Sequence, residues 1–308
     1  MKSIATLFLF TSLGFGAVAQ TTITNGGFEN WGNASPGLAS EPTSWYSDKS
    51  GSSIASAGPQ TCFKDSTTVH SGNYSVKVVT ETYIGTAVNG VVTTGVVNAP
   101  SLTKSDGYIG TVNTSSASDD RRMPFTGRPD SLVGWYQYTS GGAGEQAKIR
   151  AILHTGDYYD PETPTTYHPD DTANRIADVT FLGSTSNVST WTRFSVPFTY
   201  YKATSPAYIM INVTPSANQA TTVTGSTLIL DDLAVAYKPA GVTNVSIKEE
   251  NVNVYSSCKT VYVNFVTGND EQSVLTIFDI SGKKVFSHIV MNNQFNSFRL
   301  SSLNTGVY

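Results

Sequence analysis

The sequence predicts an all-β protein, in which a jelly-roll β-sandwich is followed by a small, incomplete β-sandwich domain. Three observations predict this class. Apolar and polar side chains alternate with a period of two in one segment after another. Clusters of Gly, Asn, Ser and Pro bound these segments. Charged residues make up only 14% of the 308 residues, and Ser, Thr, Asn and Gly stand in their place, which suits short strands and turns better than helices.

Each expected strand has one apolar face. Segment 132–138, for example, places Tyr136 and Tyr138 on one face and Trp135 and Gln137 on the other. Pro197 interrupts another segment, which predicts an edge strand or a bulge there. The alternating segments of the large domain are 74–78, 132–138, 147–153, 194–200, 207–213 and 228–235.

The first 19 residues have the pattern of a secretory leader. Lys2 supplies a positive charge, residues 4–15 are apolar, and Ala17-Val18-Ala19 is a small-residue cleavage site. The apolar run is shorter than the about 20 residues that a membrane span needs. We therefore expect a protein that is secreted or on the outer cell surface, with no transmembrane segment in the mature chain.

A second domain begins after the Pro-Gly-containing stretch at 238–241. We expect the sandwich to occupy residues 20–238, a linker to occupy 239–249, and the small β-domain to occupy 250–308. Within it, strands at 274–280 and 285–290 flank a turn and predict a hairpin. The chain stops at the first residues of a further strand, so we expect that this domain is truncated.

Charge and cysteine usage exclude several classes of partner. The net charge is −4, and the large domain has one pair of adjacent basic residues, Arg121 and Arg122, so we expect no nucleic-acid interface. Cys62 and Cys258 fall in different expected domains, and we expect both to be unpaired. Their spacing excludes a cysteine-based zinc site.

The small domain resembles the C-terminal sorting domain of the type IX secretion system. Three elements carry the resemblance: 253–255 (Asn-Val-Tyr), 275–285 (Leu-Thr-Ile-Phe-Asp-Ile-Ser-Gly-Lys-Lys-Val) and 300–308 (Leu-Ser-Ser-Leu-Asn-Thr-Gly-Val-Tyr). The usual Pro-Asn-Pro is replaced by Ser-Ser-Cys at 256–258, and the final strand of the family is missing. The resemblance implies an address that the secretion machinery reads, with no part in chemistry.

The large domain resembles the "putative carbohydrate metabolism domain" (PCMD), a galactose-binding-like jelly roll. Six elements in order carry this resemblance: 25–31, 42–46, 124–129, 132–138, 191–194 and 225–233. The resemblance implies work on carbohydrate without implying a particular reaction, because a fold does not fix a function.

The same resemblance implies a candidate calcium site. Modules of this class place their first and last strands side by side, which would bring Glu29 close to Asp231 or Asp232. Calcium prefers several oxygen ligands. Without a bulge, only one of the two neighbouring Asp side chains can face Glu29. The alternative is that these carboxylates accept hydrogen bonds from turns or backbone N–H groups.

An aromatic sugar platform is the second candidate site. Whichever of the two faces of 135–138 points outward, with Trp135 on one face and Tyr136 and Tyr138 on the other, would offer rings for sugar C–H groups. Arg150, His154 and Tyr200 would add donors or rings. The alternative is that the rings fill the core, since sandwiches bury aromatic side chains for their area.

The acidic, tyrosine-rich loop 157–171 is the third candidate. It contains Tyr158 and Tyr159 and is stiffened by three prolines. Long loops in compact domains often bind ligands. A glycosidase needs two carboxylates around the bond, and nothing in the sequence pairs this loop with a second one. No nucleophile elbow, zinc-binding His pair or phosphate loop is present in the sequence.

These observations lead to one main function and two alternatives. We expect a carbohydrate- or glycan-binding module at the cell surface or outside the cell. One alternative is a glycoside hydrolase or another carbohydrate-active enzyme, which predicts two convergent carboxylates, one with a raised pKa. The other is a structural or adhesion module, which predicts aromatic rings in the core and no site.

Overall fold

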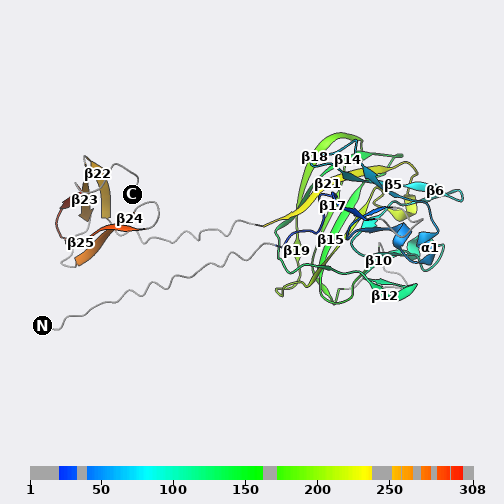
Figure 1. Ribbon diagram of the computed structural model, residues 1–308, viewed down its shortest axis with the longest axis horizontal. Helices are drawn as coiled ribbons and strands as arrows, with labels where there is room; N and C mark the ends of the chain where they lie inside the picture. Colours follow the sequence, from blue (N-terminus) through cyan, green and yellow to red (C-terminus); the bar gives the residue numbers. More distant parts are fainter. Residues whose placement is uncertain are drawn as a thin grey trace. The chain divides into compact units, whose positions relative to one another are not determined.

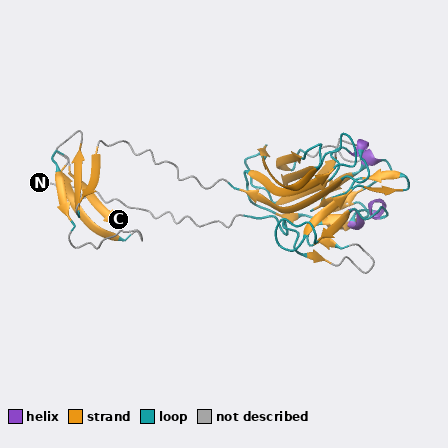
Figure 2. Cartoon of the chain, turned by 90° about the horizontal axis from the view of Figure 1, so that it is seen from above, coloured by secondary structure: helices purple, strands orange, loops and turns teal. Residues whose placement is uncertain are grey.

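The computed structural model describes residues 21–32, 40–161, 172–237, 252–257, 259–265, 272–278, 283–291 and 293–300. The chain divides into two compact units, Met1–Pro239 and Ala240–Tyr308 (Figure 1). The expected leader (1–19), the linker (239–249), residues 162–171 of the loop 157–171 and the chain end at 301–308 lie outside the described residues. Strands dominate both units, and the helical segments are short (Figure 2).

The first unit is a sandwich of two antiparallel sheets, which confirms the predicted fold class. The five-stranded sheet runs in the order β18 (Val188–Pro197), β14 (Ser131–Thr139), β21 (Thr227–Ala236), β5 (Ser75–Val79) and β4 (Cys62–Asp65). The seven-stranded sheet runs in the order β19 (Thr199–Tyr200), β17 (Arg175–Leu182), β15 (Lys148–His154), β20 (Tyr208–Thr214), β8 (Val92–Thr93) and β3 (Tyr46–Ser47), and β13 (Met123–Pro124) also pairs with β20.

The core lies between these sheets, on the faces that the alternation predicts. From β14 the side chains of Leu132, Tyr136 and Tyr138 are buried, and from β15 those of Ile149 and Leu153. Buried apolar area of this kind is the main favourable term in folding. The hydroxyl of Tyr138 donates to the carbonyl of Pro215 at 3.0 Å, so the ring is buried without an unsatisfied polar atom.

Pro197 marks the place where the chain passes from one sheet to the other. It ends β18, an edge strand of the five-stranded sheet, and β19 begins two residues later in the seven-stranded sheet. Because proline has no N–H to donate, an edge is where a strand tolerates it. The predicted edge position is therefore confirmed.

A third, smaller layer covers part of the outer face of the seven-stranded sheet. It consists of β9 (Val96–Asn98), β10 (Tyr108–Gly110) and β16 (Tyr159–Pro161). Ile152 and Met210 point out of the large sheet, and Tyr158 and Ile109 pack against them as a second core cluster. The alternation of apolar and polar residues did not predict this layer. The layer buries several residues that the sequence analysis proposed for ligand binding.

Short elements surround one flank of the sandwich. They are the hairpin β6 (Glu81–Tyr83) and β7 (Thr86–Val88), the one-turn segments η1 (Asp48–Ser50), η2 (Lys104–Asp106) and η3 (Gln219–Thr221), the short helix α1 (Ser53–Ser56), and the pairs β1 (Trp31–Gly32) with β2 (Glu41–Pro42) and β11 (Val112–Asn113) with β12 (Ser116–Asp120).

The second unit is a small β-domain. Strands β22 (Val252–Ser257), β23 (Thr260–Phe265) and β26 (Asn296–Arg299) form one sheet, and β24 (Gln272–Phe278) pairs with β25 (Lys284–Met291). The second pairing confirms the predicted hairpin. Val261, Val263 and Val290 form the buried centre. Within the described part of the chain, no helix has the length and apolar character to span a membrane.

Candidate functional site

The three carboxylates predicted to bind calcium converge on the segment 70–74. Glu29 accepts hydrogen bonds from the backbone N–H groups of Asn73 (2.9 Å) and Tyr74 (3.2 Å). Asp231 Oδ2 accepts from the backbone N–H groups of His70 and Ser71 at 2.9 and 3.2 Å. Glu29 therefore lies close to Asp231, as predicted, although both side chains bind the backbone of the segment 70–74.

A bulge in β21 lets both neighbouring Asp residues reach this segment. Asp232 has a φ of 47°, and the register between β14 and β21 shifts at this point. A bulge re-aims a side chain that would otherwise point to the opposite face. Asp232 Oδ2 lies 2.6 Å from His70 Nδ1, and Asp232 Oδ1 accepts from the hydroxyl of Ser71 at 2.7 Å.

The hydrogen-bond donors around these carboxylates favour the alternative given above, in which the carboxylates accept hydrogen bonds, over calcium binding. Every carboxylate oxygen of Glu29, Asp231 and Asp232 already faces an N–H or O–H donor, whereas calcium needs oxygens directed at the ion. In the part of the chain that is described, no three His, Cys, Asp or Glu side chains are grouped to hold a metal ion. Calcium binding stays a prediction that only a binding experiment tests.

The segment held by these carboxylates covers Trp135. The outward face of β14 carries Trp135 and Gln137, while Tyr136 and Tyr138 are buried. The His70 ring stacks on Trp135 with centroids 4.1 Å apart and planes 20° apart, and Trp191 contacts His70 edge-on at 5.6 Å. The face of the Trp135 ring that His70 covers cannot stack on a sugar, and sugar binding at Trp135 stays a prediction for the rest of the ring.

Four other predicted site residues are buried. Tyr136 and Tyr138 are 5% and 1% exposed in the main core, and His154 and Tyr158 are fully buried beneath the third layer. Burial lowers the pKa of His154 to about 4, so this ring is neutral at physiological pH. These four residues are corrected from ligand-binding to structural positions.

The remaining predicted residues lie at or near the surface but have structural partners. Arg150 pairs with Asp160 and Asp178 at 3.4 and 3.3 Å. Tyr159 contacts Tyr108 edge-on at 5.9 Å. The hydroxyl of Tyr200 donates to the carbonyl of Pro129 at 2.7 Å, and burial raises the pKa of Tyr200 to about 12. None of these rings stands in an open row.

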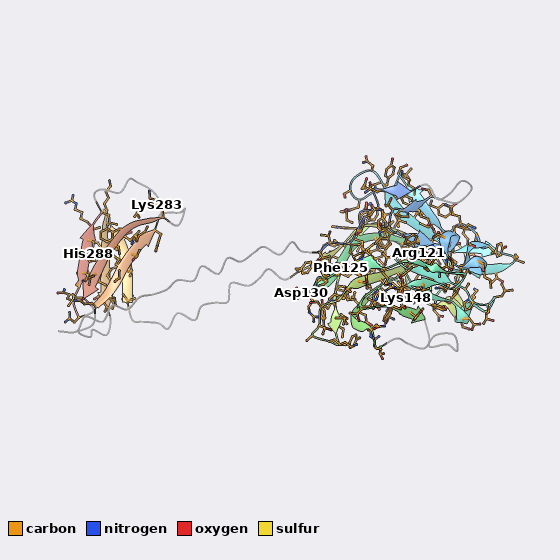
Figure 3. The ribbon with its side chains drawn as sticks, turned by 60° about the horizontal axis from the view of Figure 1, so that its bottom comes forward. Arg121, Phe125, Asp130, Lys148, Lys283 and His288 are labelled. Carbon is orange, nitrogen blue, oxygen red and sulfur yellow. The ribbon has the colours of Figure 1, made fainter. Side chains whose placement is uncertain are left out.

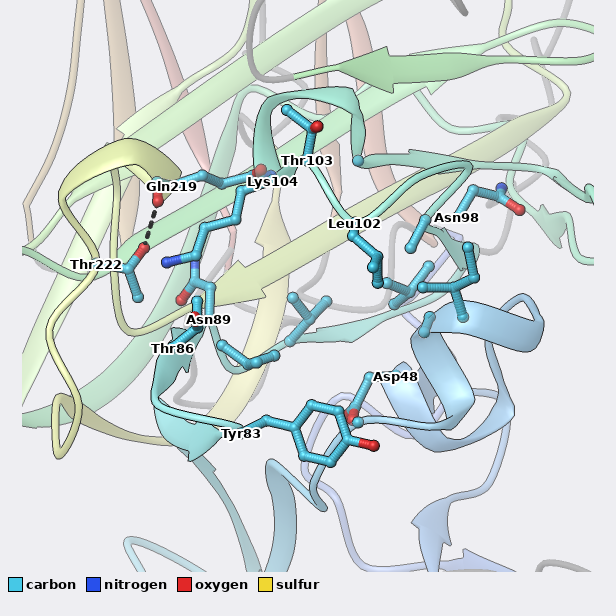
Figure 4. Close-up of a pocket in the computed structure, with 18 of the residues that line it drawn as sticks. Asp48, Tyr83, Thr86, Asn89, Asn98, Leu102, Thr103, Lys104, Gln219 and Thr222 are labelled. Atoms are coloured by element: carbon cyan, nitrogen blue, oxygen red, sulfur yellow. Dashed lines mark hydrogen bonds between the residues drawn. The ribbon is translucent and has the colours of Figure 1, made fainter.

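A cavity lies at the flank built by the short elements. We call it the flank pocket: it has a volume of about 420 Å³ and lies between the β6–β7 hairpin, α1, the loop 99–107 and η3 (Figure 4). Volumes of 300–1,000 Å³ are typical of small-molecule sites. None of the residues singled out from the sequence lines the flank pocket.

A smaller depression of about 90 Å³, lined by Arg150, Lys148 and Asn212, shares five lining residues with the flank pocket. Lys148 projects from β15 (Figure 3).

Asp48 is the one Asp or Glu among the residues lining the flank pocket. The residue is 4% exposed; Oδ1 accepts from the hydroxyl of Thr61 at 2.6 Å, while Oδ2 has no hydrogen-bond partner among the described residues. Burial raises the pKa of Asp48 from 3.8 to about 6. The adjacent Lys49 donates to the carbonyls of Ser56 and Gly58 rather than to this carboxylate.

Several other polar side chains of the pocket have structural partners: the amide of Asn89, for example, donates to the carbonyl of Ser216 and accepts from the hydroxyl of Thr214. Tyr83 and Lys104 differ, because their polar ends make no hydrogen bond with a described residue. Figure 4 places Tyr83 and Asp48 at one edge of the pocket and Lys104 with Gln219 and Thr222 at the other.

Sequence reasoning missed this pocket because turns and short segments build it. The available signal was an apolar residue in each of two turn-rich segments, Ile84 before Gly85 and Leu102 between Ser101 and Thr103. Such exposed apolar residues are unremarkable one at a time. Only the fold shows that both line one cavity.

The family comparison agrees with the sequence resemblance of the first unit. Residues 21–236 match the family model described as "Putative carbohydrate metabolism domain". No curated protein matches the chain.

Solved structures with similar strand arrangements include two titled as putative glycoside hydrolases. The one from Bacteroides thetaiotaomicron is 18% identical, with 63% of each chain covered and a TM-score of 0.45. The one from Bacteroides vulgatus is 18% identical, with 70% of this chain and 98% of that chain covered and a TM-score of 0.43. A module titled TmCBM61, in complex with β-1,4-galactotriose, is 13% identical, with 70% and 97% covered and a TM-score of 0.33. The chain thus spans less than two thirds of the first of these proteins.

Proposed function

Because the chain belongs to the putative carbohydrate metabolism domain family, we propose that its first unit binds a carbohydrate or glycan in the flank pocket without cleaving it. The observation that carries this proposal is the composition of the pocket wall. An exposed aromatic ring, a buried carboxyl group with one oxygen unpartnered, and a lysine line the same cavity. A few polar groups placed around apolar walls are what small-molecule sites use to orient a ligand.

Tyr83 supplies the stacking surface in this proposal. It ends β6 and is 41% exposed at the pocket edge. A half-exposed tyrosine offers an apolar face together with a hydroxyl, which suits a ligand whose own surface alternates C–H and O–H groups. This ring takes the role that the sequence analysis gave to Trp135.

Asp48 supplies the polar anchor. Its Oδ2 is closed to solvent and has no donor among the described residues, so a ligand hydroxyl that displaces the covering side chains and donates to it would satisfy the atom. Hydrogen bonds to an ionised acceptor are about twice as strong as neutral ones. Lys104 at the opposite edge adds a donor for a second hydroxyl.

Binding is favoured over hydrolysis because the flank pocket is lined by one carboxylate. Glycosidases of the acid–base type use two, about 5–9.5 Å apart. The observation that supports the hydrolase alternative is the raised pKa of Asp48, which is the state a general acid needs. A released sugar would therefore move the proposal to an enzyme in which Asp48 is the acid.

We also propose that the protein is exported and displayed or released outside the cell. Support comes from the leader-like residues 1–19 and from the sorting-domain resemblance of 250–308. The small β-domain described at 252–300 is compatible with that resemblance. Deleting residues 250–308 should leave the protein inside the cell envelope, which fractionation of the producing cells would measure.

The test of the binding proposal is a glycan-array screen of the full chain, followed by calorimetry on the hits and by assay of the same panel for released sugar. Tyr83→Ala should weaken binding at least tenfold, or about 1.4 kcal/mol. Tyr201→Ala is the matched control, because Tyr201 is 51% exposed but lies outside the flank pocket. Equal losses in both variants would contradict the assigned site. Silence across the array would favour the structural-module alternative.

A further inference from the structure

Exposed apolar side chains concentrate around the flank pocket. Six large hydrophobic residues of the first unit's described part are exposed, and four of them line this pocket. Leu102 is 91% exposed and Ile84 is 86% exposed, and they come from different elements, the loop before η2 and the β6–β7 turn. Ile54 and Tyr83 are the other two. Single exposed leucines need no explanation, but a cluster at a cavity marks a contact surface.

Ile84 is also held in an unfavourable backbone conformation. The β6–β7 turn has two central residues, Ile84 and Gly85, with φ values of 47° and 73°. A two-residue turn of this kind favours Asn or Asp followed by Gly. A β-branched residue in the left-handed region is a genuine outlier, and such strain is typical of functional sites. Folding alone would be served better by asparagine at this position.

The pocket presents both polar groups and apolar side chains to a ligand. Lys104, Gln219 and Thr222 gather at one edge and Asp48 lies at the other, while the side chain of Leu102 lies away from Lys104 (Figure 4). The edge with Lys104 continues into the neighbouring depression through shared residues that include Gln219 and Asn89. A ligand that spans this pocket therefore meets polar groups at both edges and apolar side chains in the wall.

We propose that the ligand of the flank pocket is an amphiphilic glycoside, whose sugar meets Asp48, Tyr83 and Lys104 and whose apolar aglycone, an alkyl or aryl group, contacts Ile84 and Leu102. This inference rests on the proposed carbohydrate binding and specifies its substrate class. It gives the strained Ile84 a role, since its exposed side chain contributes to binding rather than to the core. An apolar segment of a protein partner or of a second copy is the competing occupant.

The test uses five probes on the full chain: the methyl and octyl β-glucosides, the methyl and octyl β-galactosides, with the octyl compounds below their micelle concentrations, and 1-octanol. By calorimetry, the octyl glycoside of the preferred sugar should bind at least tenfold more tightly than its methyl partner. Ile84→Asn and Leu102→Ser should each lower the affinity for the octyl glycoside about three- to tenfold and leave that for the methyl glycoside unchanged. Leu182→Ser, at an exposed leucine outside the pocket, should change neither.

A second readout separates function from folding. Ile84→Asn should raise the melting temperature by about 2–4 °C while it weakens octyl glycoside binding, because asparagine fits the turn. Equal affinity for methyl and octyl glycosides would overturn the inference and leave carbohydrate binding intact. Octanol binding as tightly as the octyl glycoside would overturn the proposed function instead. A concentration-dependent dimer that Ile84→Asn abolishes, without glycoside binding, would assign the surface to a second copy and overturn both.

Discussion

The buried carboxyl group of Asp48 should make the protein less stable as the pH rises from about 4 to about 6. Its pKa in the folded protein is raised from 3.8 to about 6, and burial is the largest cause. The folded state therefore holds a proton that the unfolded state has released within this window. For such a group, the contribution to stability is fully present below pH 3.8 and is lost as the pH passes 6.

The magnitude follows from the size of the shift. One pKa unit corresponds to about 1.4 kcal/mol, so a shift from 3.8 to about 6 corresponds to about 3 kcal/mol of unfolding free energy in all, of which about 2 kcal/mol is lost between pH 4 and pH 7.5. Asp48→Asn removes the ionisation and keeps an oxygen that can accept from Thr61. The free energy of wild type minus that of the variant should therefore fall by about 2 kcal/mol across this range.

Urea unfolding at several pH values measures this difference. The new amide also changes the unfolding free energy by an amount that does not depend on pH. This amount does not affect the result, because only the change of the difference with pH is compared. Glu81→Gln, which also removes one carboxylate from the same unit, is the control for the change in net charge. If the difference for Asp48→Asn stays flat from pH 4 to pH 7.5, the carboxyl group is not desolvated as described, and its role as an anchor in the pocket loses its basis.

Three further predictions concern the ends of the sandwich. Asp231→Ala should lower the unfolding free energy by about 2–4 kcal/mol in urea titrations, because two backbone N–H groups of the segment 70–74 lose their acceptor. Gly26→Ala should lower the melting temperature by several degrees, because a Cβ there would lie 2.0 Å from the carbonyl oxygen of Leu233; Gly27→Ala, whose Cβ would have no neighbour closer than 3.7 Å, should be close to neutral. Chelation with EDTA should leave the melting temperature unchanged, since the carboxylates near 70–74 already have donors, and a fall of several degrees would restore the calcium prediction.

The sheets and their core faces could be predicted from the sequence because alternation is a local signal. In β14 and β15, every second residue enters the core, as the period of two requires. Pro197 could be placed at an edge for an equally local reason, its missing N–H. The predicted convergence of Glu29 with Asp231 came from the family pattern rather than from periodicity.

The site could not be predicted because it depends on contacts between distant short segments. The third layer consists of strands of three residues each, too short to show a period, yet it buries His154 and Tyr158. His70 lies 65 positions before Trp135, and no local pattern indicates that their rings stack. The carboxylates of Glu29, Asp231 and Asp232, which the sequence analysis assigned to calcium, hold the segment 70–74 in place. A carboxylate can accept a hydrogen bond or bind a metal ion, so the residue type alone does not distinguish the two roles.

Two destabilising features meet at the flank pocket, and this coincidence is the strongest reason to assign function there. Asp48 is a buried carboxyl group with an unpartnered oxygen, and Ile84 is a β-branched residue in a left-handed turn. Each departs from a general rule of stable folding, and such departures gather at functional sites. The double variant Asp48→Asn, Ile84→Asn should therefore melt above the wild type at pH 7.5 and fail to bind the octyl glycoside. A double variant that is more stable and still binds would show that the two features are accidents of the fold.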